Sequence, residues 1–79
     1  MNATKLNQEA NPSNLYPESD PRHHTSRIHF MLNELIDHLN EDIKKIDEPA
    51  AKVLFSTGAE VLIGLRTAFE HYEQAEDDV

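Results

Sequence analysis

Residues 53–65 constrain the fold of this chain more than any other segment, because thirteen residues in a row carry a single charge, at Glu60. The run also contains both glycines of the chain, Gly58 and Gly64. An apolar segment of this length is unfavourable in water, so other elements have to cover it. It is shorter than the roughly 20 apolar residues of a membrane-spanning helix. We therefore expect it at the centre of a water-soluble assembly.

Length and composition narrow the classes of protein. A chain of 79 residues allows one small domain, and the absence of cysteine rules out disulfides and thiolate metal sites. Fifteen Asp and Glu against seven Lys and Arg give a net charge of -8, which disfavours nucleic acids and anionic membranes as partners. The N-terminus lacks the basic and apolar regions of a signal peptide, which favours a cytoplasmic location.

The pattern after residue 21 predicts a first helix over about 22–46. Asp20 before Pro21 fits an N-cap followed by proline at the first helical position, while Thr25 or Ser26 would fit a later start. Apolar residues then recur at steps of three and four, which places them on one helix face: Ile28, Met31, Leu32, Leu35, Ile36, Leu39, Ile43 and Ile46.

The segment 47–49 predicts a tight turn into a second helix over about 49–74. Pro49 cannot continue the first helix but suits the first turn of a new one, and Asp47 or Glu48 can cap it. Such a short connection makes the two helices antiparallel neighbours. The fold class is therefore all-α, a helical hairpin over residues 22–75. Residues 1–21 are expected to be a disordered or loosely docked arm, and residues 76–79 a frayed acidic tail.

The second helix carries more apolar surface than one neighbouring helix can cover. A first row follows the alternating spacing of a coiled coil: Ala51, Leu54, Gly58, Val61, Leu65, Ala68 and Tyr72. A second row at spacing seven lies beside it: Phe55, Leu62 and Phe69. Val53 and Ile63 fall outside both rows. A helix that is apolar almost all round is buried on several sides, so we expect a homodimer that forms a four-helix bundle.

The expected dimer interface centres on the 53–65 run. It comprises Val53, Thr57, Gly58, Glu60, Val61, Ile63 and Gly64, together with Phe30, which projects away from the apolar side of the first helix. Each glycine costs roughly 1 kcal/mol in a helix interior, which a close helix crossing can offset. Alternatively, Thr57-Gly58-Ala59-Glu60 has the form of a capping box and would split the helix. The continuous helix is favoured because the first row passes through Gly58 without a slip.

A metal site is the alternative to a pure interaction role. Glu34 and His38 are spaced to bind one ion from a single helix face, and the antiparallel pairing brings Glu60 level with them. Ferritin-like bundles, however, use a Glu-x-x-His motif that this chain lacks. A second group forms at the open end of the hairpin, where His23, His24 and His29 lie near His71 and Glu70. Divalent metal binding therefore stays a secondary expectation.

The sequence offers little support for catalysis. Cysteine is absent, no Gly-x-Ser-x-Gly elbow is present and no glycine loop fits a phosphate. The expected function is therefore a small acidic homodimer that acts as a protein-interaction or adaptor module. A metal-binding bundle is the alternative, and an acidic nucleic-acid mimic would require the acids to line one extended face. Glu60 needs an explanation because it is the single charge in the apolar run, and an unpaired buried charge is unfavourable. We expect it to face solvent, to pair with an arginine or to bind a metal.

Overall fold

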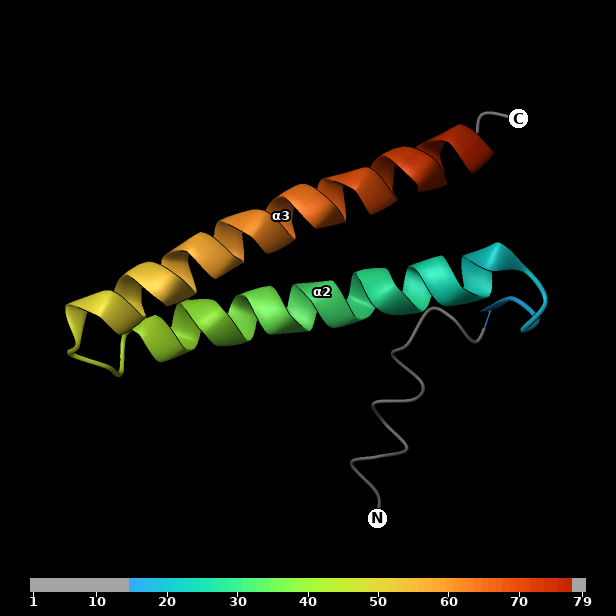
Figure 1. Ribbon diagram of the computed structural model, residues 1–79. Helices are drawn as coiled ribbons and strands as arrows, with labels where there is room; N and C mark the ends of the chain where they lie inside the picture. The colour runs from blue at the N-terminus through green and yellow to red at the C-terminus, as the bar shows by residue number, and fades with distance from the viewer. Residues whose placement is uncertain (1–14, 78–79) are drawn as a thin grey trace, which may run out of the picture.

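Two antiparallel helices and a short turn make up the described part of the chain. A computed structural model describes residues 15–77, in which helix α2 spans Pro21–Ile43 and helix α3 spans Pro49–Asp77 (Figure 1). The helices pack against each other along the hairpin, which confirms the all-α helical hairpin. Positions 1–14 of the expected arm and 78–79 of the expected tail lie outside the described residues.

Helix α2 begins as predicted. Asp20 is its N-cap in an extended conformation, its carboxylate accepts the backbone N–H of Arg22 at 2.9 Å, and Pro21 takes the first helical position. The helix ends at Ile43, three residues before the predicted end. Lys44 and Lys45 then donate their backbone N–H groups to the carbonyls of Glu41 and Asp42, which tightens the last turn into the connection.

Helix α3 is continuous, which confirms that Thr57 and Gly58 do not split it. It begins at Pro49 as predicted, and the carbonyl of Glu48 accepts the first helical N–H, from Lys52, at 3.0 Å. It continues through Asp77, three residues past the predicted end. Within residues 15–77, neither helix combines the length and the apolar content that crossing a lipid bilayer requires.

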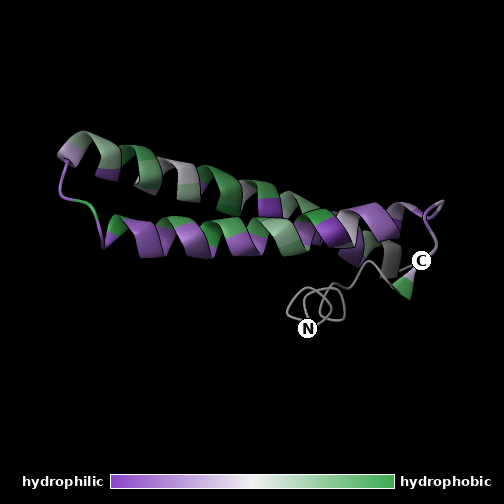
Figure 2. Ribbon diagram, turned by 90° about the horizontal axis from the view of Figure 1, so that it is seen from below, coloured by the Kyte–Doolittle hydropathy of each residue, from purple (hydrophilic) through white to green (hydrophobic). Residues whose placement is uncertain are grey.

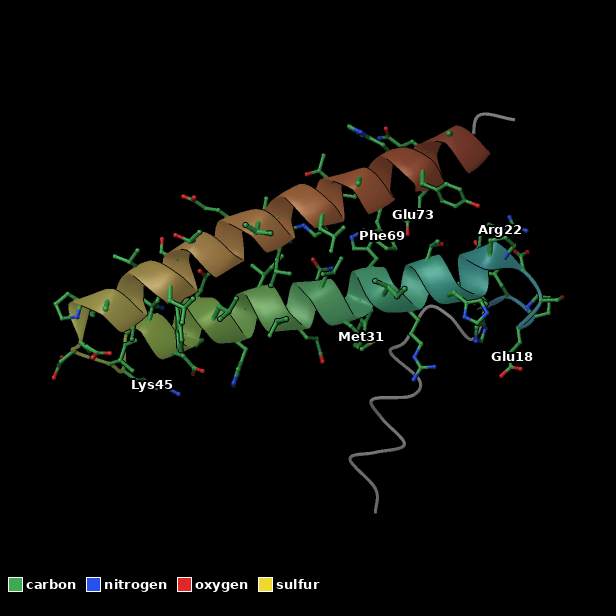
Figure 3. All side chains as sticks on the ribbon, viewed as in Figure 1. Glu18, Arg22, Met31, Lys45, Phe69 and Glu73 are labelled. Atoms are coloured by element: carbon green, nitrogen blue, oxygen red, sulfur yellow. The ribbon has the colours of Figure 1, made fainter. Side chains whose placement is uncertain are left out.

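The core lies between the two helices and is small. Leu32 and Ile36 of α2 and Ala59 of α3 are the buried apolar residues of the described chain. The second row of α3 is half-buried on the side that faces α2, and Figure 3 shows Phe69 projecting into the space between the helices. Of the two apolar rows of α3, the hairpin therefore uses the second.

Residues 15–20 fold back onto the first turn of α2. The rings of His23 and His24 form hydrogen bonds with the backbone carbonyls of Tyr16 and Glu18, at 2.9 and 2.8 Å. The guanidinium of Arg22 lies 4.4 Å from the centre of the Tyr16 ring, and Arg22 also pairs with the Asp20 carboxylate. This part of the expected arm is therefore docked on the helix start.

Candidate functional site

An exposed apolar surface is the most prominent feature of the hairpin. Seven large apolar side chains, each between 39% and 66% exposed, contribute to it. We define the apolar face by these residues: Ile28, Met31 and Leu35 of α2, and Leu54, Val61, Leu65 and Tyr72 of α3. The four residues of α3 belong to the first row, which therefore stays uncovered. Figure 2 shows how far apolar residues extend along α3, while α2 alternates between polar and apolar positions.

Helix geometry places both parts of the apolar face on the same side of the hairpin. An α-helix turns by 100° per residue, so on α2 the exposed residues lie about a quarter of a turn from the line of Leu32 and Ile36. On α3 the first row lies about a quarter of a turn from the residues that meet α2. Because the helices are antiparallel, these two rotations point to the same side. The apolar face is thus one surface shared by both helices.

The apolar face includes an open groove along α2. The hollow has a volume of about 570 Å³ and is lined by Ile28, Met31, Leu32, Glu34, Leu35 and His38. In Figure 3 the Met31 side chain projects away from α3. The two polar residues, Glu34 and His38, lie at one margin of the groove, while its remaining lining is apolar. Such a groove fits apolar side chains better than a polar substrate.

A polar cluster joins the helices at their open end. The Nδ1 atom of His29 lies 3.0 Å from a carboxylate oxygen of Glu73, and its Nε2 atom lies 3.5 Å from Glu70. Arg66 donates to the side-chain oxygen of Asn33 at 2.8 Å and also lies 3.8 Å from Glu70. These contacts connect α2 to α3, so the cluster orients the two helices. His71, which was expected beside it, is exposed.

The residues of the predicted metal site do not come together within one chain. Glu34 and His38 are neighbours on α2, but His38 Nε2 lies 3.2 Å from a carboxylate oxygen of Asp42. Glu60 is exposed on α3. The described residues contain no group of three or more His, Asp or Glu side chains that could hold a metal ion. A site built from Glu34, His38 and Glu60 stays a prediction, and the hairpin alone does not assemble it.

The predicted interface residues lie at several positions around the hairpin. Val61 is on the apolar face, and Gly58 is half-buried between that face and α2. Val53, Thr57, Glu60 and Gly64 are exposed further round α3. Ile63 is 40% exposed and Phe30 is half-buried, both away from the apolar face.

Sequence reasoning did not assign Leu54, Leu65 and Tyr72 to an uncovered surface, although their coiled-coil spacing was the available signal. The spacing alone does not show which of the two apolar rows of α3 faces α2. Arg66, the arginine nearest to Glu60 in the sequence, pairs with Asn33 and Glu70. Glu60 faces solvent in the single chain.

Comparisons with protein family models, with characterised proteins and with solved structures gave no match for this chain. The apolar face therefore has to be interpreted from its own geometry and chemistry.

Proposed function

We propose that this chain is a small protein-interaction module that works as a homodimer, in which two hairpins pack their apolar faces together to form a four-helix bundle. The observation that carries this proposal is the uncovered apolar face, formed by Ile28, Met31, Leu35, Leu54, Val61, Leu65 and Tyr72. The bundle then serves as an adaptor whose acidic outer surface, with a net charge of -8 per chain, meets a further protein.

The size of the apolar face supports an interaction role. From Leu54 to Tyr72 the first row is about 27 Å long at 1.5 Å per residue. The two helix axes lie about 10 Å apart and the exposed residues of α2 extend about 10 Å along the face, so its projected area is about 370 Å². This area is similar to that of the largest apolar patch on a typical monomer, a patch that often has a function. Covering each half-exposed side chain contributes about half of the roughly 1.5–3 kcal/mol of full burial.

A second copy is the occupant that fits the face best. The residues that define the face carry no charge, so the face offers nothing that would select a strongly acidic or basic partner. In a two-fold dimer the same patch meets itself, which an apolar patch does without leaving an unpaired charge. On each helix the uncovered residues lie about a quarter of a turn from the intrachain contact. That angle is the one between neighbouring contacts in a square four-helix bundle.

Charge substitutions on α3 test this proposal. Val61→Glu places a carboxylate in the middle of the apolar face, where burial of an unpaired charge costs several kcal/mol. Ser56→Glu adds the same charge at an exposed position of α3 outside the face. In sedimentation velocity at micromolar concentration, we expect the wild type and Ser56→Glu to be dimers. Val61→Glu should sediment as a monomer, or lose helix content.

The same experiment can refute the proposal. A wild type that sediments as a single chain, with the helix content of the hairpin, would contradict it. Equal sedimentation of the Val61→Glu and Ser56→Glu dimers would show that another surface holds the copies together.

A further inference from the structure

We infer that in the homodimer α3 packs against α3 of the second copy in the antiparallel direction, with the two-fold axis level with Ile63. This inference rests on the proposed function, because it assigns the geometry of the same interface. It specifies which residues meet across the dimer and gives a reason for the glycine at position 58, inside α3.

The length of the first row indicates which helix of the second copy covers it. From Leu54 to Tyr72 the row needs an apolar partner surface about 27 Å long. On α2 the exposed apolar residues extend only from Ile28 to Leu35, which is about 10 Å. Beyond Leu35 the same side of α2 carries His38 and Asp42, which pair with each other. The first row of α3 is therefore matched in length by α3 of a second copy and not by α2.

Symmetry and charge set the direction. When two hairpins pack face to face with α3 on α3, a two-fold axis that also brings α2 onto α2 makes each pair antiparallel. The end of α3 carries Glu70 and Glu73, followed in the sequence by Glu76, Asp77 and Asp78. A parallel dimer would bring both acidic ends together. The antiparallel dimer instead places each acidic end beside the partner's turn end, where three exposed lysines balance three exposed acids: Lys44, Lys45 and Lys52, with Glu41, Asp47 and Glu48.

The register follows from the centre of the first row. An axis level with residue 63 pairs Leu54 with Tyr72, Gly58 with Ala68 and Val61 with Leu65 of the second copy. Two small residues then share a layer, which lets the helix backbones approach closely. Within one chain a methyl group added to Gly58 would lie 3.8 Å from Leu39, an ordinary contact, so the hairpin itself does not require this glycine.

The same axis also accounts for the face of α2. Gly58 lies against Leu39 and Arg66 against Asn33, so residue 63 lies level with about Leu35. An axis at Ile63 therefore brings Leu35 close to Leu35 of the second copy. Both helices of the hairpin place the centre of their exposed apolar residues near the same two-fold axis.

Cross-linking of single cysteines tests the direction and the register, because the chain contains no cysteine of its own. Leu54→Cys and Tyr72→Cys are prepared separately, mixed in denaturant, refolded and treated with a short bis-maleimide. In the antiparallel register residues 54 and 72 are neighbours, whereas two copies of residue 54 lie about 27 Å apart. Random exchange of equal amounts makes half of the dimers heterodimers, and we expect these heterodimers to be cross-linked. We expect no cross-linked dimers with either variant alone.

The outcomes separate this inference from the proposed function. A cross-link with Leu54→Cys alone indicates parallel helices and overturns the inference. A dimer by sedimentation without any cross-link in the mixture overturns the register while the homodimer stands, and a monomer overturns both. Leu35→Cys provides a second readout if Leu54→Cys or Tyr72→Cys loses helix content. In the expected dimer, the introduced cysteine of one Leu35→Cys chain should form a disulfide with the introduced cysteine of the other chain. Ser56→Cys, outside the face, is the matched control and should not cross-link with Tyr72→Cys.

Discussion

At the scale of single residues, the two glycines of α3 each lower helix stability. The proposed second chain offsets this cost at one of the two positions. Neither glycine has a positive φ, so neither is needed for an unusual backbone conformation. Gly58 lies where the proposed antiparallel dimer would bring two α3 helices close together. Gly64 is exposed, and a methyl group added to it would meet nothing within 4 Å. The two positions should therefore respond differently to a larger side chain.

Gly64→Ala should stabilise the protein. The substitution adds no contact and restricts the unfolded chain, so the free energy of unfolding should rise by about 0.5–1 kcal/mol. Urea unfolding followed by circular dichroism measures this change, with dimer formation checked at the same concentration. Gly58→Leu is the matched comparison and should weaken the dimer. A loss of stability in Gly64→Ala would mean that a partner backbone lies against Gly64.

Asp20 should make the start of α2 sensitive to acid. The hydrogen bonds that its side chain accepts from Arg22 hold the pKa of the Asp20 carboxyl below the ordinary value of 3.8. Because the folded state binds this proton less readily than the unfolded state, the stabilisation is complete above about pH 4. It is lost as the pH falls through the lower pKa of the folded protein.

The Asp20→Asn variant isolates this effect. At pH 7 it should melt at a lower temperature than the wild type, and the gap should close as the pH falls below 3.8. Thermal unfolding followed by circular dichroism between pH 2 and 7 measures both curves. A gap of constant size across that range would show that the Asp20 charge does not stabilise the helix start.

At the scale of helices, much of the hairpin could be predicted from the sequence. Asp20 and Pro21 fix the start of α2 and Pro49 fixes the start of α3, because each signal acts through the local backbone. The helix ends were less predictable, since Lys44 and Asp77 carry no strong stop signal. The side of α3 that faces α2 was also not predictable. Both rows are apolar, and the choice depends on how α3 is rotated in the folded hairpin.

The His29–Glu73 contact should contribute to the packing of α2 on α3. Both side chains are partly exposed, at 23% and 29%, so solvent screens the pair. A double-mutant cycle with His29→Ala and Glu73→Gln should give a coupling energy of about 0.2–1 kcal/mol at pH 6. The cycle is measured by urea unfolding. The exposed pair Glu41 and Lys44, within one helix, is a comparison that should give a smaller coupling.

At the scale of the whole molecule, one hairpin leaves many of its large apolar side chains exposed to solvent. The described chain has three buried apolar residues, while seven large apolar side chains share one uncovered face. The 53–65 run predicted that a second covering surface is needed, because α3 is apolar on more than one side. It could not identify the face, since Ile28, Met31 and Leu35 join it only once the helices are placed side by side.

Folding and assembly should therefore be coupled. A dimer that supplies most of the core makes the stability of the fold depend on protein concentration. The unfolding temperature should rise as the concentration increases from low to high micromolar, without a change in the shape of the helical spectrum.

Sedimentation equilibrium of the unmodified chain tests the central claim most directly. A homodimer that buries the apolar face predicts a mass of twice the 9.0 kDa of one chain at micromolar concentration. Dilution should reduce this mass together with the helix content. A species with the mass of one chain that keeps its full helix content at every concentration would contradict the account, because the apolar face would then be stable in water.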